Sequence, residues 1–131
     1  MTVDEVNAFL RVHFSGVYPT PIVETLNDTE ANVRLPFDAT SLRPGATISG
    51  PTLMMLADTV AYVLLLHRDV DAVGAVTANL NMNFLARPSP GDLVAHGRLL
   101  KFGRRLSTVH VAIEDEMGRL VGDASVTYAM P

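Results

Sequence analysis

The stretch "ATISGPTLMMLADTVAY", residues 46–62, decides the fold of this chain. Gly50 and Pro51 stand near its start, the residues after them are almost wholly apolar, and one carboxylate, Asp58, is its only charge. Ser49 is a suitable N-cap, and Pro51 stands where the first turn of a helix tolerates proline. We therefore expect a helix that runs to about His67. Because this helix is apolar on nearly every side, the rest of the chain must cover it on nearly every side.

Strand patterns fill most of the remaining sequence. In residues 74–85 apolar and polar side chains alternate strictly, with Val76 and Phe84 in the apolar set and Thr77 in the polar set. Further strands are expected over residues 22–26, 31–35, 93–101, 106–115 and 119–129. Short turns make the last three antiparallel neighbours. We predict an α+β fold in which a curved antiparallel sheet of about six strands wraps around the central helix.

The length of 131 residues suits one domain, so we expect a single domain over residues 1–131. Val3, Val6 and Phe9 recur at helical spacing and predict an N-terminal helix within residues 1–15. A sheet wrapped around one helix leaves its edges and outer face open. Such an arrangement favours association between copies of the chain.

The composition argues against several classes of function. The net charge is −4 and the isoelectric point about 5.4, whereas nucleic-acid binding needs a basic face, so we expect no nucleic-acid partner. The chain has no cysteine, and its four histidines lack metal-ligand spacing, so we expect no metal. The apolar run of residues 53–66 is shorter than the ~20 residues of a membrane span and contains Asp58. We expect a cytoplasmic protein without a membrane partner.

Two features of the central helix could carry chemistry. Asp58 has no lysine or arginine within a helical turn, and a buried carboxylate without a partner is costly. It is either held by Thr59 or a backbone amide, or it is a general base. Gly50 is either a simple turn residue or the donor of a first-turn amide that polarises a carbonyl group. The residues alone leave both alternatives open.

A family resemblance bears on these alternatives. The layout "GATISGPTLMMLADTVAY … TANLNMNFLARPSPGD … GRR … GRLVGDASVTY" resembles the hotdog-fold thioesterases of the PaaI (phenylacetate-degradation) type, from about Ile22 onward. The resemblance implies hydrolysis of acyl-CoA thioesters, with coenzyme A as part of the substrate and no cofactor. Gly50 matches the first glycine of the family's His-Gly-Gly motif, and Asp58 matches the acid that serves as base or nucleophile. Thr77 matches a Ser or Thr that helps to hold the attacking water.

The sequence departs from the family motif at three positions. Ser49 replaces the motif histidine, Pro51 replaces the second glycine, and Arg43 falls where relatives often carry asparagine. An alternative is therefore a hotdog protein that binds acyl-CoA or another apolar ligand without turning it over. A hotdog dehydratase is a third possibility, but the chain lacks the histidine paired with an acid that characterises it.

The spacing of Gly50 and Asp58 predicts a site shared between subunits. They are eight residues apart, which is about 12 Å along a helix. An oxyanion donor and a base must both reach one thioester group, each within ~3 Å of its target atom. One helix cannot easily provide both, but two antiparallel helices across a homodimer can. The resemblance implies the same arrangement, with dimers paired into a tetramer.

Further residues are expected to bind the substrate. Candidate walls for the acyl group are Met54, Met55, Tyr62 and Phe84, and Ser49 is a further candidate substrate contact. The densest basic cluster stands at a turn between strands and consists of Lys101, Arg104 and Arg105. Together with Arg87, it is expected to bind the phosphates of coenzyme A. The alternative for this cluster is a solvated hairpin end.

Overall fold

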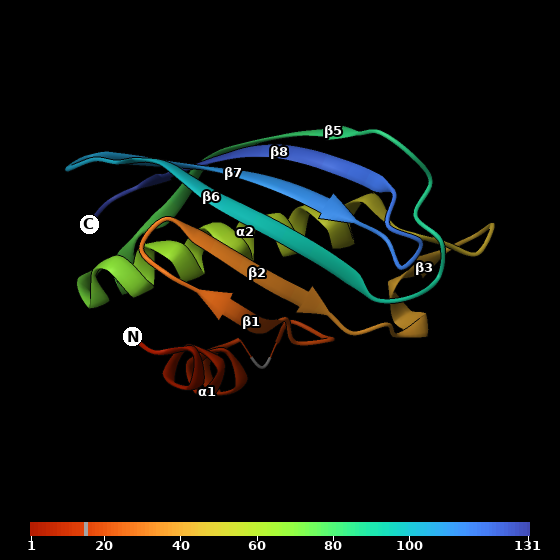
Figure 1. The fold of residues 1–131 in the computed structure, drawn as a ribbon, viewed down its shortest axis with the longest axis horizontal. Helices are drawn as coiled ribbons and strands as arrows, with labels where there is room; N and C mark the ends of the chain where they lie inside the picture. The colour runs from red at the N-terminus through yellow and green to blue at the C-terminus, as the bar shows by residue number, and fades with distance from the viewer. Residues whose placement is uncertain (15) are drawn as a thin grey trace.

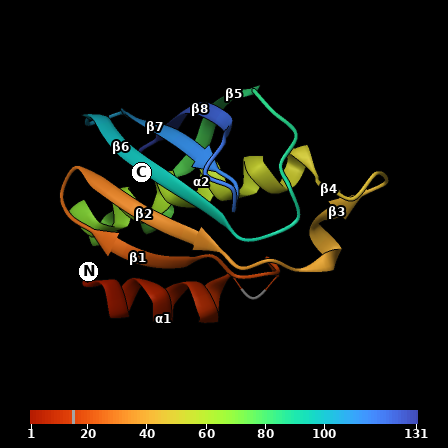
Figure 2. The same cartoon turned by 45° about the vertical axis from the view of Figure 1, so that its right-hand side comes forward.

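One long helix, α2 (Gly50–Arg68), lies against the concave face of a curved antiparallel sheet in the computed structural model, which describes residues 1–14 and 16–131 (Figures 1 and 2). The sheet has six strands in the order β1-β2-β6-β7-β8-β5. Their bounds are β1 Ile22–Leu26, β2 Glu30–Leu35, β5 Val76–Phe84, β6 Leu93–Phe102, β7 Leu106–Glu114 and β8 Leu120–Ala129. The predicted α+β hotdog fold is confirmed.

The N-terminal helix covers one edge of this sheet. It is α1 (Val3–His13), shorter than the expected range of 1–15, whose residue 15 lies outside the described residues. Thr2 and Glu5 form a capping box at its start. The Asn7 side chain donates to the Val23 carbonyl at 3.0 Å and accepts from the Val23 amide at 2.8 Å. Because α1 satisfies backbone groups of β1, that edge is protected from pairing with another strand.

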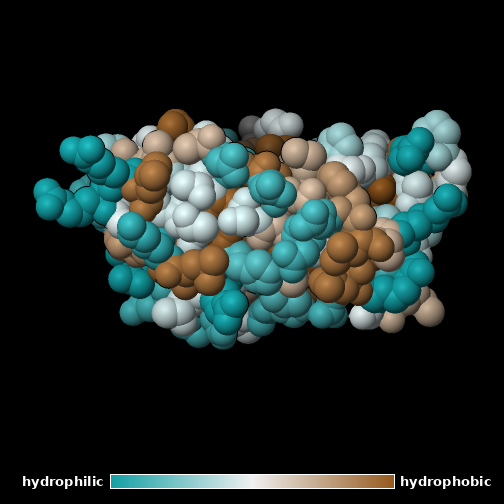
Figure 3. Space-filling model, turned by 90° about the horizontal axis from the view of Figure 1, so that it is seen from above, coloured by the Kyte–Doolittle hydropathy of each residue, from teal (hydrophilic) through white to brown (hydrophobic). Residues whose placement is uncertain are grey.

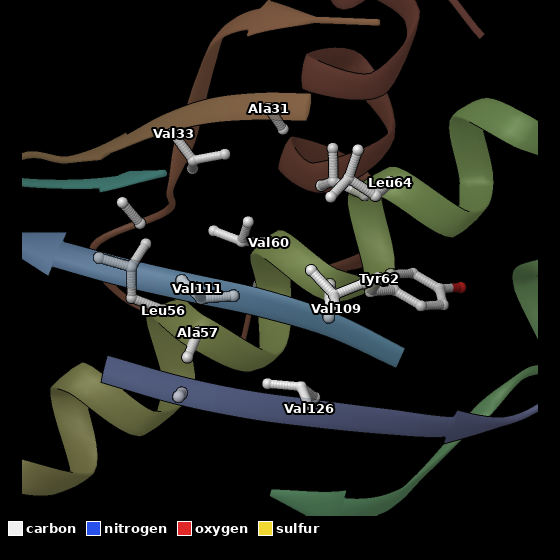
Figure 4. Packing of buried hydrophobic residues seen from close by; sticks show 14 of the residues in the cluster. Ala31, Val33, Leu56, Ala57, Val60, Tyr62, Leu64, Val109, Val111 and Val126 are labelled. Carbon is white, nitrogen blue, oxygen red and sulfur yellow. The ribbon is translucent and has the colours of Figure 1, made fainter. Parts of the chain in front are cut away.

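Helix α2 is the core of the domain. Ser49 accepts a hydrogen bond from the Thr52 amide at its start, and the Asp69 amide donates to the Leu65 carbonyl at its end. Figure 4 shows its buried side chains, among them Val60 and Leu64, in one cluster with those of the strands, among them Val109. The helix is long and apolar enough to cross a membrane, yet most of its residues are buried inside the domain. It therefore has the composition of a core helix.

Strand β6 approaches α2 at a glycine. A Cβ atom built on Gly97 would overlap Val60 Cγ1 and would lie 3.2 Å from Leu64 Cδ1. Gly97 is buried and belongs to the strand at the centre of the sheet. The missing side chain thus allows the helix to lie this close to the sheet.

Short elements connect the main ones and shape the start of α2. They are the 3₁₀ turns η1 (Ala39–Ser41) and η2 (Val70–Gly74) and the two-stranded ribbon of β3 (Leu42–Arg43) and β4 (Thr47–Ile48). The Ser49 amide donates to the Ser41 carbonyl at 2.9 Å. This hydrogen bond ties η1 to the residue that caps α2 and holds the N-terminal end of the helix in place.

Strand β5 lies at the other edge of the sheet and, among residues 1–14 and 16–131, pairs only with β8. The strict alternation predicted for this strand is wrong, because its register shifts between Thr77 and Asn79. This β-bulge leaves both Thr77 and Phe84 on the α2 side: Thr77 contacts Asp58, and Phe84 lies against Gly50. Unbroken alternation would have put an odd-numbered and an even-numbered residue on opposite faces.

Candidate active site

Asp58 is held by two hydroxyl groups from the sheet. Its Oδ1 accepts a hydrogen bond from Thr77 Oγ1 at 2.8 Å and another from the Tyr128 hydroxyl at 2.8 Å. Asp58 is half-buried, whereas the sequence suggested a buried carboxylate. Thr59, one of the partners that the sequence allowed, donates instead to the Met55 carbonyl at 2.9 Å. The partners of Asp58 are therefore distant in sequence, one on β5 and one on β8.

A cleft of about 320 Å³ opens at Asp58. Its walls include Thr77 and three aromatic side chains from different elements, and we call it the Asp58 cleft. The ring of Tyr62 lies 5.6 Å from that of Phe14 and 5.9 Å from that of Tyr128. The Tyr62 hydroxyl donates to the Val73 carbonyl at 2.8 Å, and burial raises its pKa. The Asp58 carboxylate and the hydroxyls of Thr77 and Tyr128 thus lie in one cleft beside aromatic rings.

Gly50 lies in a different cleft, of about 400 Å³, which we call the Gly50 cleft. Phe84 forms part of its wall, and a Cβ atom on Gly50 would lie 3.2 Å from the Phe84 ring. Arg43 and Arg87 also line it. Sequence reasoning had noted Arg43 only as a departure from the family motif.

The amide of Gly50 is available to a ligand. The Thr52 amide is occupied by Ser49, whose Oγ lies 3.3 Å and whose carbonyl oxygen lies 3.1 Å away. Pro51 has no amide hydrogen, and the described part of the chain offers the Gly50 amide no hydrogen-bond acceptor. This donor stands at the positive end of a 19-residue helix and inside a cleft. Ser49, a predicted substrate contact, caps the helix in this structure.

The predicted acyl-binding residues do not gather at one place within a single chain. Tyr62 belongs to the Asp58 cleft and Phe84 to the Gly50 cleft, and the two clefts share no lining residue. Met54 is 39% exposed and Met55 half-buried, and they line neither of these clefts. One chain therefore holds two halves of the predicted site.

The predicted basic clamp is also divided. Arg87 lies in the Gly50 cleft, at the N-terminal end of α2. The cluster of Lys101, Arg104 and Arg105 stands at the β6–β7 turn, near the C-terminal end of α2 (Figure 1). There the Arg68 guanidinium stacks 4.8 Å from the centre of the Phe102 ring. Within one chain Arg87 and this cluster lie toward opposite ends of α2, so their joint action on one ligand stays a prediction that requires a second subunit.

Local charge also differs between the two basic sites. Arg104 lines a cleft together with the carboxylates of Asp69 and Asp71. Arg43 and Arg87 line the Gly50 cleft without a carboxylate among its lining residues. Acidic neighbours reduce the attraction of Arg104 for an anion, so within one chain the charge of the Gly50 cleft is the more favourable for an anion.

Tyr128 is the contact of Asp58 that sequence reasoning missed. It lies on β8 in the same alternating set as the buried Val126 and Ala124, a pattern that places its ring toward α2. The pattern could have shown that the ring faces the helix, but not that its hydroxyl reaches Asp58. Over residues 1–14 and 16–131, no group of three or more His, Cys, Asp or Glu side chains is placed to hold a metal ion.

The fold and these clefts define a hotdog protein of the thioesterase class. Residues 45–122 match the thioesterase superfamily, and the chain belongs to that family. A candidate thioesterase from Silicibacter sp. TM1040 is 33% identical, with a TM-score of 0.88 over 100% of this chain and 92% of that one. A search of curated proteins found no match.

More distant structures share the fold. Zebrafish thioesterase superfamily member 2 is 18% identical, with a TM-score of 0.86 over 100% of this chain and 99% of that one. A hypothetical thioesterase from Streptococcus pneumoniae TIGR4, determined with coenzyme A, is 21% identical, with a TM-score of 0.82 over 92% of this chain and 94% of that one. The family and its neighbours support thioester hydrolysis in general.

Proposed function

We propose that the protein is a cytoplasmic PaaI-type thioesterase that hydrolyses acyl-CoA to a free acid and coenzyme A. The observation that carries this proposal is the Asp58 carboxylate, which opens into a cleft on the central helix while two hydroxyls hold one of its oxygens. A fixed carboxylate beside space for a substrate is suited to act as a base or a nucleophile. The reaction proposed needs no metal or cofactor.

In the proposed reaction Asp58 removes a proton from water, whose oxygen then attacks the thioester carbon. The C–S bond breaks and coenzyme A leaves as a thiolate that takes up a proton; alternatively, the carboxylate attacks directly and water hydrolyses the resulting anhydride. Thr77 donates its hydrogen to Asp58, so its oxygen lone pairs are free to accept a hydrogen bond from that water. The Gly50 amide stabilises the negative charge that develops on the carbonyl oxygen.

The proposed unit is a homodimer, with dimers paired into a tetramer. Strand β5 is a free edge, and its side chains Val76 and Phe84 are 62% and 54% exposed. Figure 3, which views the molecule from the β5 side, shows apolar patches among polar atoms. Pairing of two β5 strands would cover this edge and set two α2 helices side by side. Gly50 of one subunit would then complete the site of Asp58 in the other.

The same arrangement accounts for the divided substrate contacts. With antiparallel helices, the N-terminal end of one α2 meets the C-terminal half of the other. Arg87 and Arg43 of one subunit would then act with the basic β6–β7 turn of its neighbour on the phosphates of coenzyme A. The acyl group would lie between side chains contributed by both subunits: Met54, Met55, Tyr62 and Phe84. The S. pneumoniae relative supports this ligand class, since its structure was determined with coenzyme A.

The proposal is tested with a panel of acyl-CoA thioesters of different chain length and aromaticity, with release of free thiol as the readout. We expect hydrolysis that depends on Asp58. The replacement of the motif histidine by Ser49 favours one other function, binding without turnover. Measurable binding of acyl-CoA with no thiol release from any substrate would establish that alternative, and neither binding nor turnover would contradict both.

A further inference from the structure

We infer that Tyr128 is a positioning residue that fixes Asp58 through Oδ1 and leaves Oδ2 as the reactive oxygen. This inference deepens the proposed function and rests on it for its catalytic meaning. The contacts that it uses are properties of the folded chain, so they can also be tested without turnover.

Two donors converge on one carboxylate oxygen. Tyr128 donates to Asp58 Oδ1 at 2.8 Å, with a longer contact of 3.2 Å to the Asp58 carbonyl oxygen. Thr77 donates to the same Oδ1 at 2.8 Å. The described residues provide no hydrogen bond to Oδ2. Since Oδ1 is occupied twice, the lone pairs of Oδ2 are the ones that remain for water or a thioester carbon.

The strand pairing explains why the two hydroxyls meet. Thr77 and Tyr128 are register partners across β5 and β8. The β-bulge that follows Thr77 turns its side chain to the α2 side, where Tyr128 already lies. A cross-strand pair has Cβ atoms about 5 Å apart, which suits two side chains that share one acceptor.

The Tyr128 ring is itself held in place. It is 5% exposed, and it stacks on Tyr62 with ring centres 5.9 Å apart. A buried ring of this kind cannot change its orientation freely, so its hydroxyl is a fixed donor.

Tyr128 remains a neutral donor at physiological pH. Burial raises the pKa of Tyr128 well above its ordinary value, and the nearby Asp58 carboxylate adds to this effect. The titratable side chains that line the cleft are Asp58, Tyr62 and Tyr128, and the Tyr62 hydroxyl is engaged with the Val73 carbonyl. Oδ1 of Asp58 thus accepts hydrogen bonds from two neutral hydroxyl groups.

The test compares Tyr128→Phe with wild type. Phenylalanine keeps the buried ring and removes one of the two donors to Oδ1, so the carboxylate is held less firmly. We expect the NMR chemical shift of the Asp58 carboxyl carbon, measured at pH 7, to change. In the same variant kcat should fall roughly tenfold with little change in KM.

Tyr18→Phe is the matched control. Tyr18 is 70% exposed and donates to Asp38 at 3.0 Å, so this variant also removes a tyrosine–aspartate hydrogen bond, but outside the Asp58 cleft. It should leave the chemical shift of the Asp58 carboxyl carbon and the value of kcat unchanged. A merely structural role of Tyr128 would lower the melting temperature without changing that chemical shift or kcat.

The outcomes separate this inference from the proposed function. An unchanged carboxyl chemical shift in folded Tyr128→Phe overturns the inference, whether or not the enzyme is active. A changed chemical shift in a protein that hydrolyses no thioester supports the contact and counts against the proposed function alone. If Tyr128→Phe does not fold, a fluorinated tyrosine at position 128 keeps the ring and strengthens the donor. The carboxyl chemical shift of Asp58 should then also change, and no change would overturn the inference.

Discussion

Gly50 and Asp58 belong to one helix, eight residues apart, yet they line two separate clefts that share no residue. Gly50 offers a free amide beside two arginines, and Asp58 offers a carboxylate beside two hydroxyls. At about 1.5 Å per residue, the helix holds them about 12 Å apart along its axis. Neither cleft alone contains both a base and an oxyanion donor, so a second subunit is the simplest way to bring them together.

Mixed dimers test whether the site is shared. Asp58→Asn and Gly50→Pro should each be inactive, the second because proline removes the amide donor. When equal amounts reassociate at random, half the dimers are mixed, and each has one intact site, so about a quarter of wild-type activity should return. Gly50→Ala keeps the amide hydrogen and adds only a methyl group next to the Phe84 ring. It is the control for effects of a changed side chain at the start of the helix. Folded, demonstrably mixed dimers that stay inactive would rule out a shared site.

Asp58→Asn should lower kcat by roughly 10²- to 10⁴-fold, because asparagine has no negative charge to accept a proton. Its carbonyl oxygen can still accept the hydrogen bonds of Thr77 and Tyr128, so the fold should be retained. The rate is measured by thiol release, the fold by circular dichroism, and binding with a non-hydrolysable acyl-CoA analogue. Wild-type turnover in this variant would exclude Asp58 as base or nucleophile.

The arginines of the Gly50 cleft should recognise the nucleotide part of coenzyme A. Arg43→Ala and Arg87→Ala should raise KM for acyl-CoA more than KM for a short acyl thioester without the nucleotide. The triple variant Lys101→Ala, Arg104→Ala, Arg105→Ala tests the hairpin cluster in the same way. If a set of substitutions raises KM equally for both substrates, the replaced side chains do not contact the nucleotide. For the cluster at the β6–β7 turn, that result would show that it is a solvated hairpin end.

Gly97→Ala should destabilise the protein by about 1–3 kcal/mol, because the added methyl group overlaps Val60. Chemical denaturation measures this loss. In a Val60→Ala background the same substitution should cost less, since the opposing methyl groups are gone. Equal losses in the two backgrounds would show that the close approach of β6 to α2 is not the cause.

Asp115→Asn should destabilise the protein by roughly 1.5–3 kcal/mol near neutral pH. Asp115 is 4% exposed and accepts hydrogen bonds from Ser89, Met117 and Arg119. Arg119 also donates to the Arg87 carbonyl at 2.8 Å, so the network holds the loop that carries Arg87.

The effect of Asp115 should depend on pH. Burial opposes its ionisation, but the hydrogen bonds from Ser89 and Arg119 outweigh burial and lower the pKa of Asp115. A lowered folded-state pKa gives stability that is present above the ordinary carboxyl range and is lost as pH falls through the folded value. The difference in unfolding free energy between wild type and Asp115→Asn should therefore shrink below about pH 4. A difference that stays constant down to pH 2 would contradict this origin.

The sequence alone determined the architecture and the two central residues. A helix as apolar as residues 50–66 can be stable only when covered, and the alternating segments around it provide one sheet to do so. The resemblance to a family then singled out Gly50 and Asp58, because motif spacing is a property of the chain itself. The partner chain and the roles of these residues remain predictions.

Only the tertiary structure decided what surrounds those residues. Periodicity placed Thr77 on the polar face, away from Asp58, and the bulge beside it depends on how β5 pairs with β8, which local pattern does not encode. Tyr128 reaches Asp58 across 70 residues of sequence for the same reason. Residue type and spacing predict local structure over a few residues. Strand register is set by packing of the whole sheet against α2, and the register determines which polar groups come into contact.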